Sequence, residues 1–234
     1  DRKPMSNRSD YIAAIGELVP GSHPIGEPEK RKAIAKALAE HSRNKPRVIV
    51  EDEVGNGTHE YALSALALWQ DDFSIITQIE YPVDDDDETK DYLEAEDWTI
   101  YQKPAGYYLH FLNDTPLATE SMRITYTAPH TCTDADCTVA DADEEAVQSL
   151  AAAHFCRMLA ACYAQDQDAT IQADSVDHSS KRREYEAQAK AYRQEYYKHM
   201  NIDENRPKPA CATADWDVVY PNGWDRLTHP RRQR

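Results

Sequence analysis

The segment from residue 141 to residue 164, DADEEAVQSLAAAHFCRMLAACYA, limits the possible fold of this chain more than any other stretch. Its apolar residues recur every three or four positions, which is the period of an α-helix, and they form a wide face. Because a helix this apolar has to be covered by other elements, we expect it at the centre of a helical core. The residues that form its predicted packing face are Val147, Leu150, Ala151, Phe155, Met158, Leu159 and Cys162.

A second long helix is predicted over residues 176–199, where lysines, arginines and glutamates flank a single stripe of larger side chains. The residues on this stripe are Tyr185, Ala189, Tyr192, Tyr196 and Met200. Tyrosine joins a large apolar ring to a polar hydroxyl group, which suits a partly hydrated interface between helices. We therefore expect the stripe to pack on the preceding apolar helix or on a neighbouring subunit.

The first part of the chain contains one more helical pattern and then a change of period. Residues 27–45 read as a helix with Pro28 at an early position, where its missing N–H does no harm, and with Ile34, Ala37, Leu38 and His41 on one face. From about residue 46 to residue 130 the pattern becomes that of strands and turns. The predicted strands lie in PRVIVEDEV, HEYALSALALW, DFSIITQIEYPV and SMRITYTAPH, with a hairpin in EDWTIYQKPAGYYLHFL.

Two details of this β pattern can be tested. The hairpin is expected to turn at Pro104, Ala105 and Gly106, which are typical turn residues. The alternation in DFSIITQIEYPV predicts one half-buried face of a strand. The residues assigned to that face are Phe73, Ile75, Thr77, Ile79 and Tyr81.

These patterns predict an α+β fold. Residues 26–45 and 138–200 form a helical bundle with long C-terminal helices, and residues 46–137 form an inserted antiparallel β-domain. Residues 1–25 mix proline, glycine and serine and are expected to form an irregular N-terminal arm. Residues 201–234 are predicted to be an extended C-terminal tail.

The C-terminal tail is rich in proline and has no helical period, so disorder is one interpretation of it. Docking on a partner is the other and favoured interpretation, since large aromatic side chains are costly to leave in water. The tail residues predicted to dock are Trp216, Tyr220, Trp224, Arg226, Arg231, Arg232 and Arg234.

The chain is strongly acidic, with 26 Lys and Arg against 42 Asp and Glu, for a formal net charge of −16. Phosphate backbones repel such a chain, which argues against ordinary DNA or RNA binding.

The sequence has no apolar run near 18 residues, so we expect no membrane-spanning segment. The first ten residues also lack the apolar stretch of a signal peptide.

Two clusters could hold a metal ion. Four consecutive aspartates, Asp84 to Asp87, could bind a divalent cation, but adjacent side chains alternate in direction, so we favour a solvated loop tip. His130, Cys132 and Cys137 could begin a zinc site, but no second Cys/His pair follows at a suitable spacing. The five cysteines, an odd number without the spacing of a disulfide scaffold, indicate a reducing compartment.

Catalytic motifs are not found in the sequence. It contains no G-x-S-x-G, P-loop or G-x-G-x-x-G pattern, and Cys156 and Cys162 are expected to be core residues of the apolar helix. His154 and His178 are expected to be structural or exposed. We therefore predict no catalytic residue, no metal and no cofactor.

The order of these segments resembles that of head–tail connector proteins, also called adaptor or head-completion proteins, of tailed bacteriophages. The resemblance is closest over residues 144–197, which comprise the helix EEAVQSLAAAHFCRMLAACYAQ, a short link, and DATIQADSVDHSSKRREYEAQAKAYRQEY. It is looser over residues 73–130, in SIITQIEYPV, YLEAEDWTIYQKPAGYYLHFL and MRITYTAPHT. The large β insertion after the first helix departs from the smallest connector proteins.

The resemblance implies a structural virion protein, made in the host bacterial cytoplasm, that forms a ring of twelve copies. Such a ring would join the portal protein to the next neck or tail component and let DNA pass without sequence-specific binding. Three alternatives remain open: another neck ring such as a stopper or tail terminator, a metal-dependent hydrolase using one of the two clusters above, and a carbohydrate-binding or adhesion module built on the β-domain.

Overall fold

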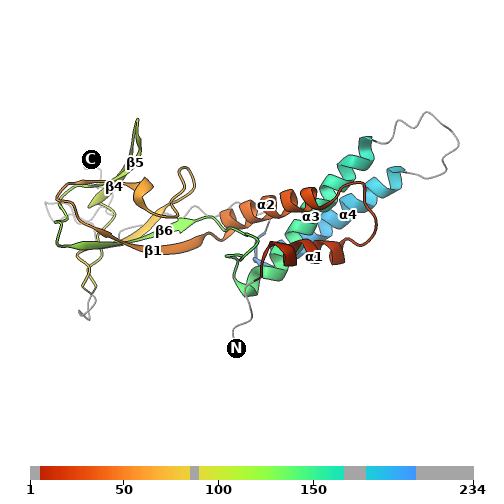
Figure 1. The fold of residues 1–234 in the computed structure, drawn as a ribbon, viewed down its shortest axis with the longest axis horizontal. Coiled ribbons are helices and arrows are strands. Elements are labelled where there is room, and N and C mark those ends of the chain that lie inside the picture. Colours follow the sequence, from red (N-terminus) through yellow and green to blue (C-terminus); the bar gives the residue numbers. More distant parts are fainter. Residues whose placement is uncertain (1–5, 85–89, 166–177, 204–234) are drawn as a thin grey trace, which may run out of the picture. The chain divides into compact units, whose positions relative to one another are not determined.

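The computed structural model describes residues 6–84, 90–165 and 178–203 (Figure 1). These residues fold into helices and two small antiparallel sheets, so the predicted α+β class is confirmed. The helices are α1 (Arg8–Leu18), α2 (Glu27–Asn44), α3 (Asp141–Gln165) and α4 (His178–His199). The strands are β1 (Arg47–Val54), β2 (Glu60–Ala62), β3 (Ile76–Glu80), β4 (Trp98–Lys103), β5 (Gly106–Phe111) and β6 (Ser121–Ala128), with a short 3-10 helix at Leu63–Ala65.

Helix α3 lies at the centre of the helical core, as its apolar sequence predicts, and contacts α1, α2 and α4. Most of the predicted face is buried, whereas Met158 and Cys162 are half-buried. Burial also continues around the helix, because small residues such as Ala152, Ala153 and Ala160 are buried. Helix α2 faces this core with Ile34, Ala37, Leu38 and His41. The small side chains on α3 let three neighbouring helices approach it closely.

The predicted irregular arm over residues 1–25 is wrong for Arg8–Leu18, which forms α1. The side chain of Asn7 accepts from the backbone N–H groups of Ser9 and Asp10, and the Asp10 carboxylate accepts from the backbone N–H of Asn7. This reciprocal cap satisfies donors that would otherwise be unpaired at the start of the helix. Tyr11 and Ile15, one turn apart, are fully buried in the helical core, so tertiary packing stabilises a helix too short to be stable alone.

The strands form two sheets of three, with the orders β1-β6-β3 and β2-β5-β4. The predicted hairpin is confirmed as β4 and β5, paired from Trp98–Phe111 to Lys103–Gly106. The segment HEYALSALALW departs from the prediction of a strand, because only β2 is extended and the 3-10 helix follows it directly. Leu63 and Leu66 in this segment are buried in the β core, so packing favours the turn that brings both inward.

The predicted face of DFSIITQIEYPV is also partly wrong. Ile79 is buried, but Ile75 is 64% exposed and its neighbour Ile76 is buried instead. A register shift between Ile76 and Gln78 in the pairing with β6 explains this change of face. An extra residue in one strand inverts the side on which the following residues point, which a regular alternation cannot anticipate.

The buried residues form two separate hydrophobic clusters, one in the helical region and one in the β-region. Cys132, Cys137 and Val139 belong to the helical cluster, although the sequence placed the first two in the β insertion. The loop that leads from β6 to α3 therefore packs with the helices.

Candidate functional site

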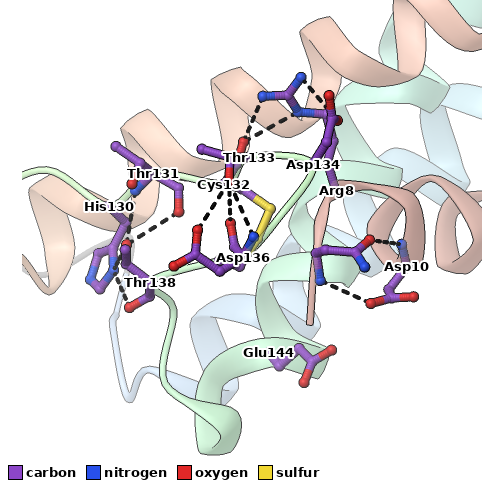
Figure 2. Close-up of a disulfide and its surroundings, with 12 residues drawn as sticks. Arg8, Asp10, His130, Thr131, Cys132, Thr133, Asp134, Asp136, Thr138 and Glu144 are labelled. Carbon is purple, nitrogen blue, oxygen red and sulfur yellow. Dashed lines mark hydrogen bonds and ion pairs between the residues drawn. A yellow bond between two sulfur atoms is a disulfide. The ribbon is translucent and has the colours of Figure 1, made fainter. Parts of the chain in front are cut away.

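The loop of residues 129–139 between β6 and α3 is closed by a disulfide between Cys132 and Cys137, shown in Figure 2. These two residues lie opposite each other on short antiparallel segments, since Thr133 N–H donates to Asp136 O and Thr138 N–H donates to Thr131 O. The prediction that the cysteines are reduced is therefore wrong for this pair. The spacing of five, which could also suit a pair of zinc ligands, brings the two sulfurs together across a tight turn.

Arg8, at the start of α1, holds this loop against the helical core (Figure 2). Its guanidinium group donates to the carbonyl oxygen of Cys132 through Nη2 at 2.9 Å and Nε at 3.2 Å. Its backbone N–H donates to Thr133 O at 2.9 Å, and Nη1 lies 3.3 Å from the Asp134 carboxylate. The position of α1 is thus tied to the disulfide loop.

His130, on the other side of the loop, joins it to the end of α2. Its ring nitrogens lie 3.0 Å from two main-chain oxygens, Nδ1 from that of Thr138 and Nε2 from that of Lys45. The backbone N–H of His130 donates to Ser42 Oγ at 2.8 Å. The former zinc-ligand candidate is therefore a structural connection in this fold.

Tyr196, on the predicted tyrosine stripe of α4, is fully buried and bonded to the C-terminal end of α2. Its hydroxyl group lies 3.1 Å from His41 Nδ1 and accepts from Asn44 Nδ2 at 3.2 Å. Burial, followed by repulsion from His130, lowers the pKa of His41 to about 4. His41 is therefore neutral at physiological pH, so its ring can share a hydrogen bond with a tyrosine inside the core.

Asp143, in the first turn of α3, is a buried carboxylate that joins two other helix ends. Lys45 Nζ lies 2.6 Å from Oδ2 and His199 Nε2 lies 3.0 Å from Oδ1. Burial alone would raise the pKa of Asp143, but hydrogen bonds from Lys45 and His199 outweigh it and the net shift is downward. A carboxylate at a helix N-terminus also interacts favourably with the helix dipole.

Glu40 forms a third polar connection, between the C-terminal half of α2 and both long helices. It lies 3.2 Å from His154 Nε2 on α3, and its Oε1 accepts from Arg193 Nη2 and Tyr197 OH on α4, each at 2.8 Å. The hydrogen bond from His154 is the main reason that the pKa of Glu40 falls to about 2, against an opposing effect of burial. The expectation that His154 is structural agrees with this arrangement.

The predicted packing residues lie between helices of one chain in this structure. Val147, Leu150, Phe155 and Leu159 are fully buried and Met158 is half-buried. Tyr185 stacks on Tyr163 with 5.6 Å between ring centroids, and Tyr192 OH donates to Leu18 O at 2.6 Å. The tyrosine stripe thus contacts α1, α2 and α3, which joins α4 to the other helices of the described residues.

Sequence reasoning placed His41 on the apolar face of α2 but did not find its partners, or the groups around Glu40 and Asp143. The sequence feature that could have indicated these groups is a polar residue at a core-facing position of an otherwise apolar pattern. Such a residue needs a hydrogen-bonding partner when it is buried. The sequence does not say which of many candidates supplies the partner, which here lies between 56 positions away, for His199 and Asp143, and 155 positions away, for Tyr196 and His41.

Two predicted sites fall wholly or partly outside the described residues. Asp84 is described, and its main-chain oxygen accepts from Lys90 Nζ, whereas Asp85, Asp86 and Asp87 are not. The predicted docking tail, with Trp216, Tyr220, Trp224 and the arginines that follow, lies outside as well. Within residues 6–84, 90–165 and 178–203, no group of three or more His, Cys, Asp or Glu side chains is placed to hold a metal ion.

The helices described here include none that is both long and apolar enough to cross a membrane. No protein-family model and no curated protein matched the chain in sequence comparisons.

Proposed function

We propose that this protein is a structural adaptor of a tailed-bacteriophage neck, which forms a ring between the portal protein and the next neck or tail component. The observation that carries the proposal is the pair of long helices α3 and α4. They coincide with residues 144–197, where the sequence resembles phage connector proteins most closely. The resemblance implies twelve copies in the virion and no catalytic activity.

The packing of this pair supports a structural role. Tyrosines of α4 bond to α1 and α2 while α3 fills the centre, so the helical region forms one closely connected core. A ring built from many copies needs such preformed surfaces, since each subunit has to present the same contacts to its neighbours.

The charge of the chain supports a role around DNA as opposed to binding it. With a net charge of −16, the protein repels the phosphate backbone, so DNA could slide through a ring of it without being held. Long-range repulsion is screened by salt over about 10 Å at 0.1 M, so the effect acts within a narrow channel.

The ring can be tested directly. We expect the purified full-length chain, mixed with its portal protein, to give a symmetric ring at the base of the portal in electron micrographs. A chain that stays separate from the portal at all concentrations would contradict the proposal.

In the same proposal, the C-terminal tail grips the portal. Deleting residues 213–234 should leave the circular dichroism spectrum of the folded helices in place and abolish attachment to portal-containing particles. If this deletion variant attaches as well as the wild type, the tail does not bind the portal. That result would not contradict the proposed ring.

A further inference from the structure

Two adjoining pockets form a groove along the exposed side of α2. Their volumes are about 580 Å³ and 320 Å³, and they share Arg8, Ala35, Leu38 and Cys132 as lining residues. Ala39 and Arg43 extend the lining in the larger pocket, and Arg31 and Lys32 extend it in the smaller one. Apolar residues line much of the groove, since Ala35 and Ala39 lie one turn apart on α2 and Leu38, Phe73 and Pro129 line the larger pocket with them.

The edges of this groove are basic in an otherwise acidic chain. The groove cations are Arg8, Arg31, Lys32 and Arg43. Three of them have acidic neighbours: Arg8 pairs with Asp134 at 3.3 Å, Arg31 with Glu27 at 2.8 Å and Lys32 with Glu29 at 3.7 Å. Exposed pairs such as Arg31–Glu27 and Lys32–Glu29 are weak and exchange readily, so these two cations can bind a new carboxylate. Arg8 is half-buried and also donates to Cys132 O, so it stays with its own loop. The whole segment 27–45 carries six Lys and Arg against three Glu.

An occupant that fits this groove needs an apolar group for the apolar lining and carboxylates for the edges. Among the large hydrophobic side chains that the described residues leave exposed, Tyr92 is the aromatic one, with 53% of its surface exposed. Exposed acids flank it at Asp91, Glu94 and Glu96. No structure has to form on binding, because Tyr81 N–H donates to Asp91 O at 3.0 Å and Leu93 N–H donates to Ile79 O at 2.9 Å.

The exposed valines of β1 are a weaker candidate for the same role. Two of their acidic neighbours are already engaged, since Arg123 donates two hydrogen bonds to Asp52, and Glu51 accepts from Ala67 N–H and Tyr126 OH. The segment around Tyr92 is therefore the better complement, since it joins an exposed aromatic side chain to three exposed acids.

We propose that the basic groove on α2 binds the segment Asp91–Asp97 of a second copy of this chain, with Tyr92 in the larger pocket and Glu94 and Glu96 facing the groove cations. The two surfaces are different, so the contact is head-to-tail and can close into a ring by rotation. Aromatic side chains that fill a pocket inside a charged rim are typical centres of binding energy at protein interfaces. This inference rests on the proposed ring and names the residues of its subunit contact.

Charge reversal on each side tests the pairing. Arg31→Glu with Arg43→Glu reverses the groove, and Glu94→Lys with Glu96→Lys reverses the segment. We expect each double variant alone to assemble at least tenfold more weakly than the wild type in analytical ultracentrifugation. An equimolar mixture of the two should assemble again, because each altered surface then meets its complement. Wild-type assembly by either variant alone, or no recovery in the mixture, would overturn the proposal.

A steric test uses two exposed positions of α2. Ala39→Trp places a large side chain in the groove and should weaken assembly at least tenfold. Lys36→Trp, which lines neither pocket, is the matched control and should assemble normally. Equal behaviour of the two variants, with unchanged circular dichroism, would contradict the groove as the contact.

A photocross-linker at position 92 identifies the occupant itself. In a mixture of isotopically light and heavy chains, we expect products that join position 92 of one copy to residues 31–43 of another. Cross-links only within one chain would overturn the proposed contact. A wild-type chain that remains monomeric and gives no cross-linked product would overturn it as well. If rings form at the portal but the groove variants assemble normally, the proposed contact is wrong and the adaptor function still stands. If the cross-link forms but no ring joins the portal, the adaptor function is wrong and the contact between copies still stands.

Discussion

In the helical region, side chains far apart in the sequence join the helices to one another. In the β-region, backbone pairing joins the strands, and side-chain bonds such as Arg123 to Asp52 add to that pairing. The hydrogen-bonded residues Tyr196 and His41 are 155 positions apart in the sequence, and Arg193 and Glu40 are 153 positions apart. In the β-region, β1 and β6 pair without interruption from Arg47–Ala128 to Val54–Ser121. The outer face of β1 leaves Val48, Val50 and Val54 more than half exposed.

This difference shows which kind of change each region should tolerate. In the helical core, buried Tyr196, His41 and Asp143 bond to specific side chains elsewhere in the chain, and loss of a bonded partner leaves the remaining group unsatisfied. Backbone ladders do not depend on the identity of outward-facing side chains. We therefore expect the helical region to be sensitive to small polar substitutions and the outer β face to be insensitive to them.

The largest expected effect comes from truncating one buried phenylalanine in each region. Phe155→Ala in α3 and Phe111→Ala in β5 remove side chains that are fully buried in different clusters. Each should lower the free energy of unfolding by about 3–5 kcal/mol. Hydrogen exchange with mass spectrometry should show faster exchange in α1–α4 for the first variant and in β4–β6 for the second. Faster exchange throughout the chain in both variants would show that the two cores are not separate.

The second effect is a pH dependence confined to the helical core. Because the pKa of buried His41 falls from 6.5 to about 4, its neutral form is stabilised by folding. This stabilisation is present above pH 6.5 and is lost as the pH falls toward 4. We expect the free energy of unfolding to drop by about 2 kcal/mol between pH 7 and pH 5 from this group.

Urea unfolding at both pH values checks this expectation, with His41→Gln as the comparison. The groups that also act on His41 are His130, Asp143, Lys45 and His199, and all remain in the variant. The variant should be less stable at pH 7 but should lose less stability on acidification. An unchanged difference between the two pH values would assign the pH dependence to other groups.

A smaller effect is expected from removing single hydroxyl groups on α4. Tyr196→Phe deprives His41 and Asn44 of a buried partner and should cost about 1–2 kcal/mol of unfolding free energy. Tyr192→Phe is the matched control, since its hydroxyl group binds one carbonyl oxygen, that of Leu18, at a half-buried position. It should cost about 0.5 kcal/mol, as water can replace the lost bond. Equal costs would show that burial of the partner is not decisive.

The smallest effect is expected on the outer face of the β-region. Val50 is 57% exposed, so Val50→Thr should change the free energy of unfolding by less than about 0.5 kcal/mol. The same substitution at fully buried Val147 places a hydroxyl group in the helical core and should cost about 1–3 kcal/mol. Thermal unfolding of both variants measures the contrast. A large loss from Val50→Thr would indicate that another surface covers this face.

Much of the fold could be read from local patterns. The 3.6-residue period located α2, α3 and α4, the change to a strand pattern after residue 46 located β1 and β6, and Pro104–Gly106 located the hairpin turn. These predictions succeed because the pattern that specifies each element lies within the element itself. Helix α1 was missed because it is short, although Asn7 and Asp10 supply a cap and Tyr11, Ile15 and Val19 recur every four residues.

The sequence alone determined the fold class, the central position of the apolar helix and the acidic surface. Tertiary structure decided the partners: Cys132 with Cys137, Tyr196 with His41 and Asn44, and Asp143 with Lys45 and His199. It also decided the register shift in β3 and the groove on α2. The physical reason is that periodicity reports the face that a residue occupies, while a specific bond depends on which distant segment packs against that face.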